Sequence, residues 1–240
     1  MQRPQAAMLV IGDEILSGRT QDTNTHYLAQ QLTAHGVDLC EVRVVSDRQD
    51  AISTAVLALS RAWDVVFTSG GIGPTHDDIT ADSVAAAFGA SIDVREDARA
   101  LLHARYSRQG LELNDARLRM ARIPDGACLI DNPVSIAPGF SIQNVHVMAG
   151  VPAVFKAMVA SVLPSITGGA PLLSRSLRVE RGEGDIAGPL ADLAAEYPEL
   201  SFGSYPYQRD GRYGAHIVLR GTDPKRLDAA LAALSMAFPE

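Results

Sequence analysis

The sequence predicts an α/β protein: a three-layer α/β/α domain on a doubly wound parallel sheet, followed by a small α+β domain. Short apolar runs alternate with helical patterns from Ala6 to about residue 163. Such alternation favours parallel strands with right-handed crossovers and helices on both sheet faces. Beyond the Gly- and Pro-rich segment Pro164–Pro171 the order changes to β-α-β-β-α. We therefore predict domains 1–167 and 168–240.

The first domain should open with a strand at Ala6–Ile11, an apolar run that ends at Gly12. A helix is expected from Asp22, because the apolar residues after it have helical spacing and Gly36 can end it. The same criteria predict the later elements: strands at Leu39–Val45, Asp64–Thr68 and Asn144–Met148, and helices at Ile52–Leu59, Thr80–Phe88, Arg95–Gln109, Asn114–Arg122 and Gly150–Leu163.

The second domain should contain two helices on one face of a short sheet. Its expected elements are strands at Leu177–Arg181, Leu200–Tyr207 and Ala215–Leu219, and helices at Ile186–Tyr197 and Pro224–Ala237. The segment Gly211–Gly214 lies between two of these strands, so we read it as a hairpin turn.

The composition excludes several classes of protein. The chain has 240 residues, of which 47% are hydrophobic, and a net charge of −7. Disordered chains have few apolar residues, which this composition excludes. The sequence also has no run of roughly 18 apolar residues, as a membrane helix would need. The negative charge argues against nucleic acid as a partner. Two cysteines without a CxxC pair, and no signal-peptide pattern, predict a cytoplasmic protein.

The strongest candidate site is the segment Thr68–Thr80, which follows a strand and precedes a helix. Its glycines Gly70, Gly71 and Gly73 let the backbone approach an anion, as in a phosphate cradle. It is not a P-loop, because the Lys-Ser/Thr ending is missing. Asp77 and Asp78 would repel a bare phosphate, which predicts a bridging cation. The alternative is that these carboxylates only stabilise the helix N-terminus.

Two further segments should reach the same edge of the sheet. In Gly12–Asn24, acidic side chains beside a glycine turn could hold Mg²⁺ or accept hydrogen bonds from a ligand, or serve only as turn and cap residues. The Pro- and Gly-rich stretch Asn132–Phe140 is expected to form a binding loop. Three arginines, Arg117, Arg119 and Arg122, should line an exposed helix face, or cover a ligand phosphate from a neighbouring subunit.

Together these segments resemble the molybdopterin-binding (MoaB/Mog-like) domain in its CinA-type version, the competence/damage-inducible protein A family. The resemblance rests on Gly-Asp-Glu-Ile-Leu-Ser-Gly-Arg-Thr-x-Asp-Thr-Asn, Thr-Ser-Gly-Gly-Ile-Gly-Pro-Thr-x-Asp-Asp-Ile-Thr, Ala-Pro-Gly-Phe and Gly-Val-Pro, in this order. It implies a three-layer domain followed by a KH-like domain. We expect no amidase domain, and hence no nicotinamide-nucleotide deamidation.

The resemblance implies a pocket for a phosphorylated pterin (molybdopterin) or an adenine nucleotide. The expected ligand-binding residues are Thr68, Ser69, Gly70, Gly71, Gly73, Thr75, His76, Thr80, Gly12, Asn24, Ser135, Pro138 and Gly139. The expected catalytic residues are Asp77 and Asp78, and the expected ligands of a divalent cation are Asp13, Glu14 and Asp22. Mog-like relatives commonly form dimers or trimers, so we expect a homo-oligomer.

Two functions stay open. One is binding alone; the other is metal-dependent cleavage of ADP-ribose-like substrates at the pyrophosphate, to which CinA-type relatives are linked. Mog-type relatives adenylylate molybdopterin, and both chemistries need a cation at the phosphates. Relatives usually have a glutamate where this chain has Val154. Valine can neither bind a metal nor act as a base, so binding is better supported than catalysis.

The second domain is not expected to bind RNA, although Gly211–Gly214 matches a GXXG string. A nucleic-acid KH loop joins two helices, whereas this segment is predicted to join two strands. The net charge from Arg175 onward is −2. An oligomer or interdomain interface is the preferred role.

Overall fold

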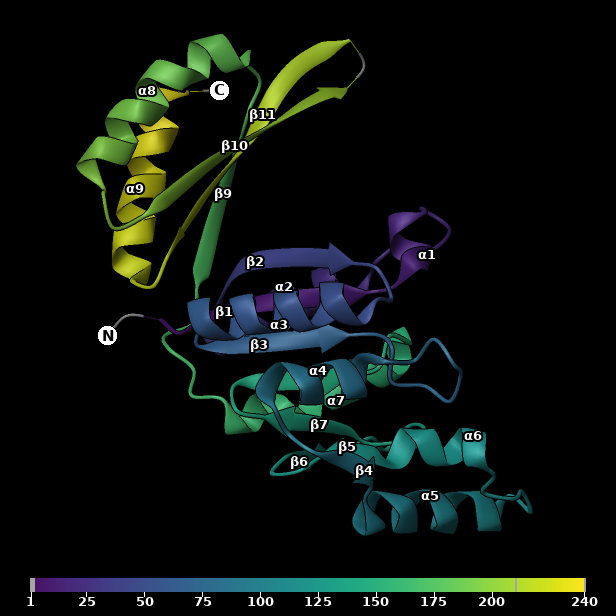
Figure 1. Ribbon diagram of the computed structural model, residues 1–240. Coiled ribbons are helices and arrows are strands. Elements are labelled where there is room, and N and C mark those ends of the chain that lie inside the picture. The colour runs from purple at the N-terminus through teal and green to yellow at the C-terminus, as the bar shows by residue number, and fades with distance from the viewer. Residues whose placement is uncertain (1–2, 210, 240) are drawn as a thin grey trace. The chain divides into compact units, whose positions relative to one another are not determined.

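In the computed structural model the chain forms two compact units, residues 1–169 and 170–240 (Figure 1). The structure describes residues 3–209 and 211–239, with only the backbone of residues 209 and 212. The division between the units lies after Gly169, within the predicted linker segment Pro164–Pro171. No helix of the described residues is long and apolar enough to cross a membrane.

Unit 1 is built on a six-stranded mixed sheet with the strand order β2-β1-β3-β8-β7-β6. The four strands from β2 to β8 are parallel, whereas β7 runs antiparallel to both of its neighbours. The six strands are β1 (Gln5–Ile11), β2 (Asp38–Val45), β3 (Val65–Ser69), β6 (Cys128–Ile130), β7 (Gly139–Ile142) and β8 (Val145–Met148).

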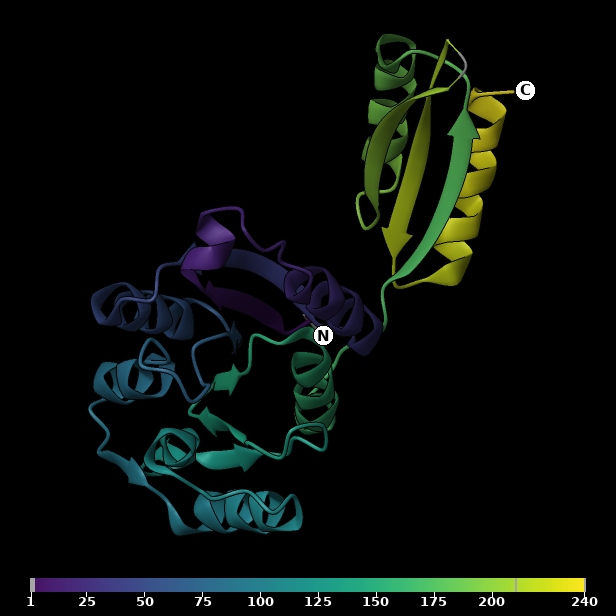
Figure 2. The ribbon, with the colours of Figure 1, turned by 90° about the vertical axis from the view of Figure 1, so that its right-hand side faces the viewer.

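Helices cover both faces of this sheet, as Figures 1 and 2 show, which confirms the predicted three layers. Leu28 and Phe155 pack on one face with Met8, while Val56 and Leu102 pack on the other with sheet residues of opposite orientation. The helices of unit 1 are α1 (Asp13–Leu16), α2 (Asn24–His35), α3 (Gln49–Ala62), α4 (Thr80–Phe88), α5 (Glu96–Arg108), α6 (Asp115–Leu118) and α7 (Pro152–Val162).

The inner strand β1 is apolar at successive positions because both of its faces are covered. Residues 6–11 are each at most 3% exposed. A strand buried on both sides shows a continuous apolar run rather than an alternation of apolar and polar residues. This is why the run was recognisable in the sequence. The edge strand β2 instead alternates between half-buried and exposed positions.

Three parts of the sequence prediction were wrong. The sheet is mixed rather than all-parallel, and β4 (Ile92–Val94), β5 (Arg122–Pro124), β6 and β7 were missed. These strands have three or four residues, too few to show a period of two. The helix predicted over Asn114–Arg122 is only α6 and one 3₁₀ turn, Arg119–Ala121, before the chain extends into β5.

Unit 2 has the predicted β-α-β-β-α order. Its elements are β9 (Leu173–Val179), α8 (Glu183–Glu196), β10 (Ser201–Arg209), β11 (Arg212–Gly221) and α9 (Pro224–Ala237). The strands form an antiparallel sheet in the order β10-β11-β9. Both helices pack on one sheet face through Ile186, Leu193, Leu227 and Leu234. The GXXG string lies in the β10–β11 hairpin, as predicted.

His146, on β8, makes stability depend on pH. Burial lowers the pKa of this imidazole from 6.5 to about 4, while Ser141 Oγ lies 2.7 Å from its Nδ1. The unfolded chain therefore binds the proton first as the pH falls. We expect the free energy of unfolding to fall by about 2 kcal/mol between pH 6.5 and 4, less than the full shift implies because part of the side chain is exposed to solvent.

Urea unfolding at several pH values measures this dependence. His146→Gln should flatten the profile between the two pKa values, whereas His103→Gln, at an exposed position of α5, should keep the parent profile. A profile unchanged in His146→Gln would contradict the assignment.

Candidate ligand-binding site

A cavity of about 520 Å³ lies in unit 1 where the chain leaves β1, β3 and β8 at their carboxyl ends. The loop after β3 lines it with Gly70, Gly71 and Gly73, the first turn of α1 with Glu14, and the start of α7 with Val154. Parallel strands that end at one sheet edge commonly hold ligands there. The volume is also within the usual range for small-molecule sites, about 300–1,000 Å³.

The loop after β3 takes a backbone shape that favours glycine. Gly70 and Gly71 have positive φ angles, 113° and 68°. A Cβ added at Gly70 would collide with the Ile11 carbonyl oxygen, and one at Gly71 with Thr80 Oγ1. A Cβ at Gly73 would lie 2.6 Å from a carboxylate oxygen of Asp78. The backbone therefore borders the cavity without side chains.

Thr80 and β8 hold this loop in position. The Thr80 hydroxyl donates to the Gly70 carbonyl at 3.0 Å, and the Thr80 backbone N–H donates to the Gly71 carbonyl at 3.0 Å. The Gly70 N–H donates to the Met148 carbonyl at 3.1 Å. Thr80 is fully buried and does not line the cavity, so its role is to fix the loop rather than to contact a ligand.

Asp77 and Asp78 both line the cavity but differ in their contacts. Asp78 Oδ2 accepts hydrogen bonds from the Thr75 N–H at 2.8 Å and the Thr75 hydroxyl at 2.6 Å, which closes the turn 75–78. Asp77 is exposed. No side-chain hydrogen bond caps α4, so neither carboxylate stabilises this helix by capping it. His76 is fully exposed and does not line the cavity.

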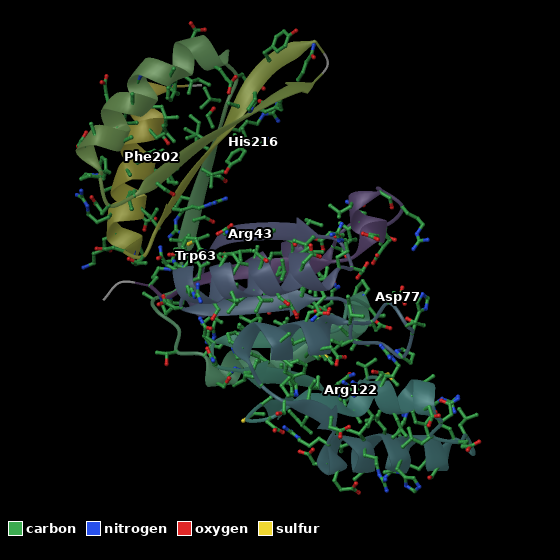
Figure 3. All side chains as sticks on the ribbon, viewed as in Figure 1. Arg43, Trp63, Asp77, Arg122, Phe202 and His216 are labelled. Carbon is green, nitrogen blue, oxygen red and sulfur yellow. The ribbon has the colours of Figure 1, made fainter. Side chains whose placement is uncertain are left out.

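Asp47, which the sequence analysis missed, adds a fourth carboxylate to Glu14, Asp77 and Asp78 in the lining. Burial raises the pKa of Asp47, and the nearby carboxylates raise it further, although the Asp13 N–H donates to its Oδ2 at 2.8 Å. Within the described part of the chain, no Lys, Arg or His lines this cavity. Figure 3 shows Asp77 on the loop at this edge, far along the sheet from Trp63.

The predicted metal ligands do not form a site together. Among the described residues there is no group of three or more His, Cys, Asp or Glu side chains that could hold a metal ion. Asp22 accepts hydrogen bonds from the N–H groups of Asn24 and Thr25 at 2.9 and 3.2 Å, so its carboxylate serves the first turn of α2. Of the three predicted ligands, Glu14 lines the cavity and Asp13 does not.

Asn24 and Ser69 form a buried link behind the cavity. Asn24 Nδ2 donates to Ser69 Oγ at 2.8 Å and to the Gly150 carbonyl at 2.7 Å. This ties α2 to the ends of β3 and β8. Thr68 is also fully buried within β3. Gly12 is buried and donates its N–H to the Val45 carbonyl. The cavity lining includes none of the predicted ligand-binding residues Gly12, Asn24, Thr68 and Ser69.

The loop after β6 is organised by Asn132, which is only 2% exposed. Its Oδ1 accepts from the N–H groups of Val134 and Ser135, and its Nδ2 donates to the Ala137 carbonyl at 2.8 Å. Ser135, predicted to bind a ligand, lines the cavity, whereas Pro138 and Gly139 do not. A Cβ at Gly139 would collide with the Val147 carbonyl, so this glycine permits close packing of β7 on β8.

The three arginines after α5 do not form one exposed helix face. Arg119 donates to the Asp78 carbonyl at 3.2 Å, and Arg122 pairs with Asp82 at 2.5 Å. Arg117 stacks on Tyr106, 4.5 Å from the ring centroid. Arg119 and Arg122, the latter labelled in Figure 3, thus brace the Gly-rich loop and α4 from outside the cavity.

Two family models cover the chain. Residues 7–168 match the probable molybdopterin binding domain, and residues 171–240 match the FAD synthase middle domain. The first match covers most of unit 1 and all the residues that line the cavity.

Similar proteins support the same assignment. A CinA-like protein of Myxococcus xanthus is 36% identical over 95% of this chain and 57% of its own length. A probable FAD synthase of Caenorhabditis elegans is 31% identical over 97% of this chain and 50% of its own length. The chain thus spans about half the length of these relatives.

A solved structure of CinA from Thermoplasma acidophilum, described as of unknown function, matches unit 1. It superposes with a TM-score of 0.63 and 34% identity over 68% of this chain and 97% of that one. By sequence and by fold, the chain belongs to the family of molybdopterin-binding domains, in its CinA-like branch.

Proposed function

We propose that unit 1 binds a phosphorylated pterin or an adenine nucleotide in the cavity at the carboxyl ends of β1 and β3. The observation that carries this proposal is the glycine loop, whose backbone borders the cavity at positions where a Cβ would collide. Backbone that is open in this way can approach phosphate oxygens closely. The similarity to molybdopterin-binding domains and to a probable FAD synthase supports both ligand classes.

The ligand should bind together with a divalent cation. Four carboxylates line the cavity, and no positive side chain of the described residues offsets them. Phosphate alone would be repelled, whereas Mg²⁺ is commonly held by one or two carboxylates plus the phosphates of the ligand. This arrangement does not require the three-residue protein site that the described residues lack.

Calorimetry with the purified chain tests the proposal. A phosphorylated pterin, AMP and ADP should each be titrated with Mg²⁺ and with a chelator. We expect saturable binding of at least one of these ligands, tighter with Mg²⁺. If no ligand of either class binds under any of these conditions, the proposal fails.

A second candidate function in the same cavity is a metal-dependent nucleotide pyrophosphatase. The carboxylates Glu14, Asp47, Asp77 and Asp78 favour it, because phosphoryl cleavage is assisted by cations that such groups can help to hold. Val154 argues against pyrophosphatase activity. Its apolar, buried side chain lies in the first turn of α7 at the cavity wall and can neither bind a cation nor act as a base.

This second function predicts AMP release from ADP-ribose in the presence of Mg²⁺, Co²⁺ or K⁺. The rate should fall by about 100-fold or more in Asp78→Ala if this carboxylate takes part in proton transfer or charge stabilisation. Asp78→Ala also removes the hydrogen bonds that close the turn 75–78. Asp77→Asn is therefore tested beside it, because it changes only an exposed side chain. Nucleotide binding without AMP release would leave binding as the function.

A further inference from the structure

One face of the unit 2 sheet carries no helix of that unit. Both α8 and α9 pack on the other face, and Figure 2 views the strands from the side without helices. Along β11, Ile217 and Leu219 are fully buried against the helices. The alternate residues His216 and Arg220 are exposed and therefore point to the opposite side.

Aromatic side chains form a strip across this face. The register aligns Tyr205, His216 and Arg178 in one row across the three strands. Tyr207, two residues further along β10, has its ring centroid 4.9 Å from that of His216. The Arg178 guanidinium lies 4.7 Å from the Tyr207 ring centroid, and its Nε donates to the Tyr207 hydroxyl at 2.5 Å.

Two glycines on the same face let the tyrosine rings lie against the sheet. A Cβ at Gly203 would be 3.0 Å from a ring carbon of Tyr205, and a Cβ at Gly214 would be 2.5 Å from the Tyr207 hydroxyl. The rings thus occupy the space that side chains would fill. Rings held in this way lose little further freedom on binding, which favours stacking with a planar partner.

Charge is divided between the two sides of unit 2. The face without helices carries Arg178, Arg220 and His216, with Glu180 paired to Arg178 at 3.1 Å. Helix α8, on the other side, carries four carboxylates and no Lys or Arg, and α9 on that side carries Lys225, Arg226 and Asp228. The net charge of −2, from which the sequence analysis excluded nucleic acid, therefore does not describe this face.

We propose that this face binds single-stranded nucleic acid. Bases stack on the exposed ring of Tyr205, and the phosphates lie against the exposed Arg220, while Arg178 covers the neighbouring Tyr207 ring. An open sheet with aromatic rings and flanking arginines is the arrangement by which unpaired bases are held without sequence readout. The occupant is a single strand because duplex bases cannot expose their faces to the rings.

Fluorescence anisotropy on the full chain tests this proposal, with labelled RNA and DNA single strands of about eight nucleotides. Tyr205→Ala should weaken binding by about 5- to 150-fold, the effect of one stacked base. The matched control is Tyr213→Ala, which changes an exposed tyrosine of β11 whose position faces the opposite side. It should change the affinity less than about twofold. Arg220→Gln should weaken all sequences similarly and reduce the salt slope by about 1.

Three outcomes would overturn the proposal: no binding at roughly 50 mM salt, equal losses in Tyr205→Ala and Tyr213→Ala, or equal affinity for a duplex. Thermal unfolding of each variant shows whether the fold is kept. Tyr205→Ala should leave nucleotide binding by unit 1 unchanged, so failure here and failure of the proposed function are separate results.

Discussion

Replacing Gly71 by alanine is expected to abolish ligand binding and to lower the free energy of unfolding by about 3 kcal/mol. Gly71 has a φ of 68°, and an added Cβ would collide with Thr80 Oγ1. The Thr80 hydroxyl could then no longer donate to the Gly70 carbonyl without moving the start of α4. The strained φ and the lost buried hydrogen bond together account for this cost.

Gly89→Ala is the matched control, because Gly89 has nearly the same φ, 65°, and nothing within 4 Å of the added Cβ. It should cost about 1 kcal/mol and leave ligand binding unchanged. Urea unfolding gives the two stabilities, and calorimetry gives the two affinities. Equal effects of the two substitutions would show that the collision with Thr80 does not matter.

Asn132→Ala should have the second largest effect, a loss of about 3 kcal/mol in the free energy of unfolding. The side chain accepts from the N–H groups of Val134 and Ser135 and donates to the Ala137 carbonyl. Its removal leaves these three loop groups without their hydrogen-bond partners, each bond contributing about 1 kcal/mol. Because Ser135 and Ala137 line the cavity, we also expect ligand affinity to fall about tenfold, since a misplaced contact costs about that much.

Asn114→Ala tests whether the effect belongs to the loop after β6. Asn114 caps α6 by accepting from the Arg117 N–H at 3.1 Å, on the surface of unit 1. Its loss should cost about 1 kcal/mol and leave the affinity as it was. Both variants are to be compared by thermal unfolding and by calorimetry with the ligand that binds best. A loss at Asn132 no larger than that at Asn114 would contradict the proposed role.

Elements with a strong local signal were predictable from the sequence. The run at residues 6–11 is apolar throughout because β1 is buried on both faces, and Gly36 ends α2 with a φ of 78°. The β-α-β-β-α order of unit 2 was predictable for the same reason. The strands β4 to β7 were not, because three or four residues carry no periodicity and their pairing depends on segments distant in the chain.

The candidate site divides in the same way. The cavity is lined by Gly70, Gly71 and Gly73. Their place between a strand and a helix marked them in the sequence, because glycine lets the backbone approach a ligand closely. Thr80 and Asn24 were predicted in the site but are buried behind it, where their hydrogen bonds hold the loops. Asp47 follows an ordinary strand, and no signal in the sequence separates it from other surface carboxylates.

By itself the sequence determined the family, the two-part organisation, the main helices and strands, and the glycine loop, because these depend on short-range patterns of apolar spacing and backbone freedom. Only the tertiary structure decided which polar side chains meet at the cavity, and that no positive side chain of the described residues lines it. It also decided that unit 2 separates its basic, aromatic face from its acidic helix. Such proximity is set by strand order and register, which join residues far apart in the chain.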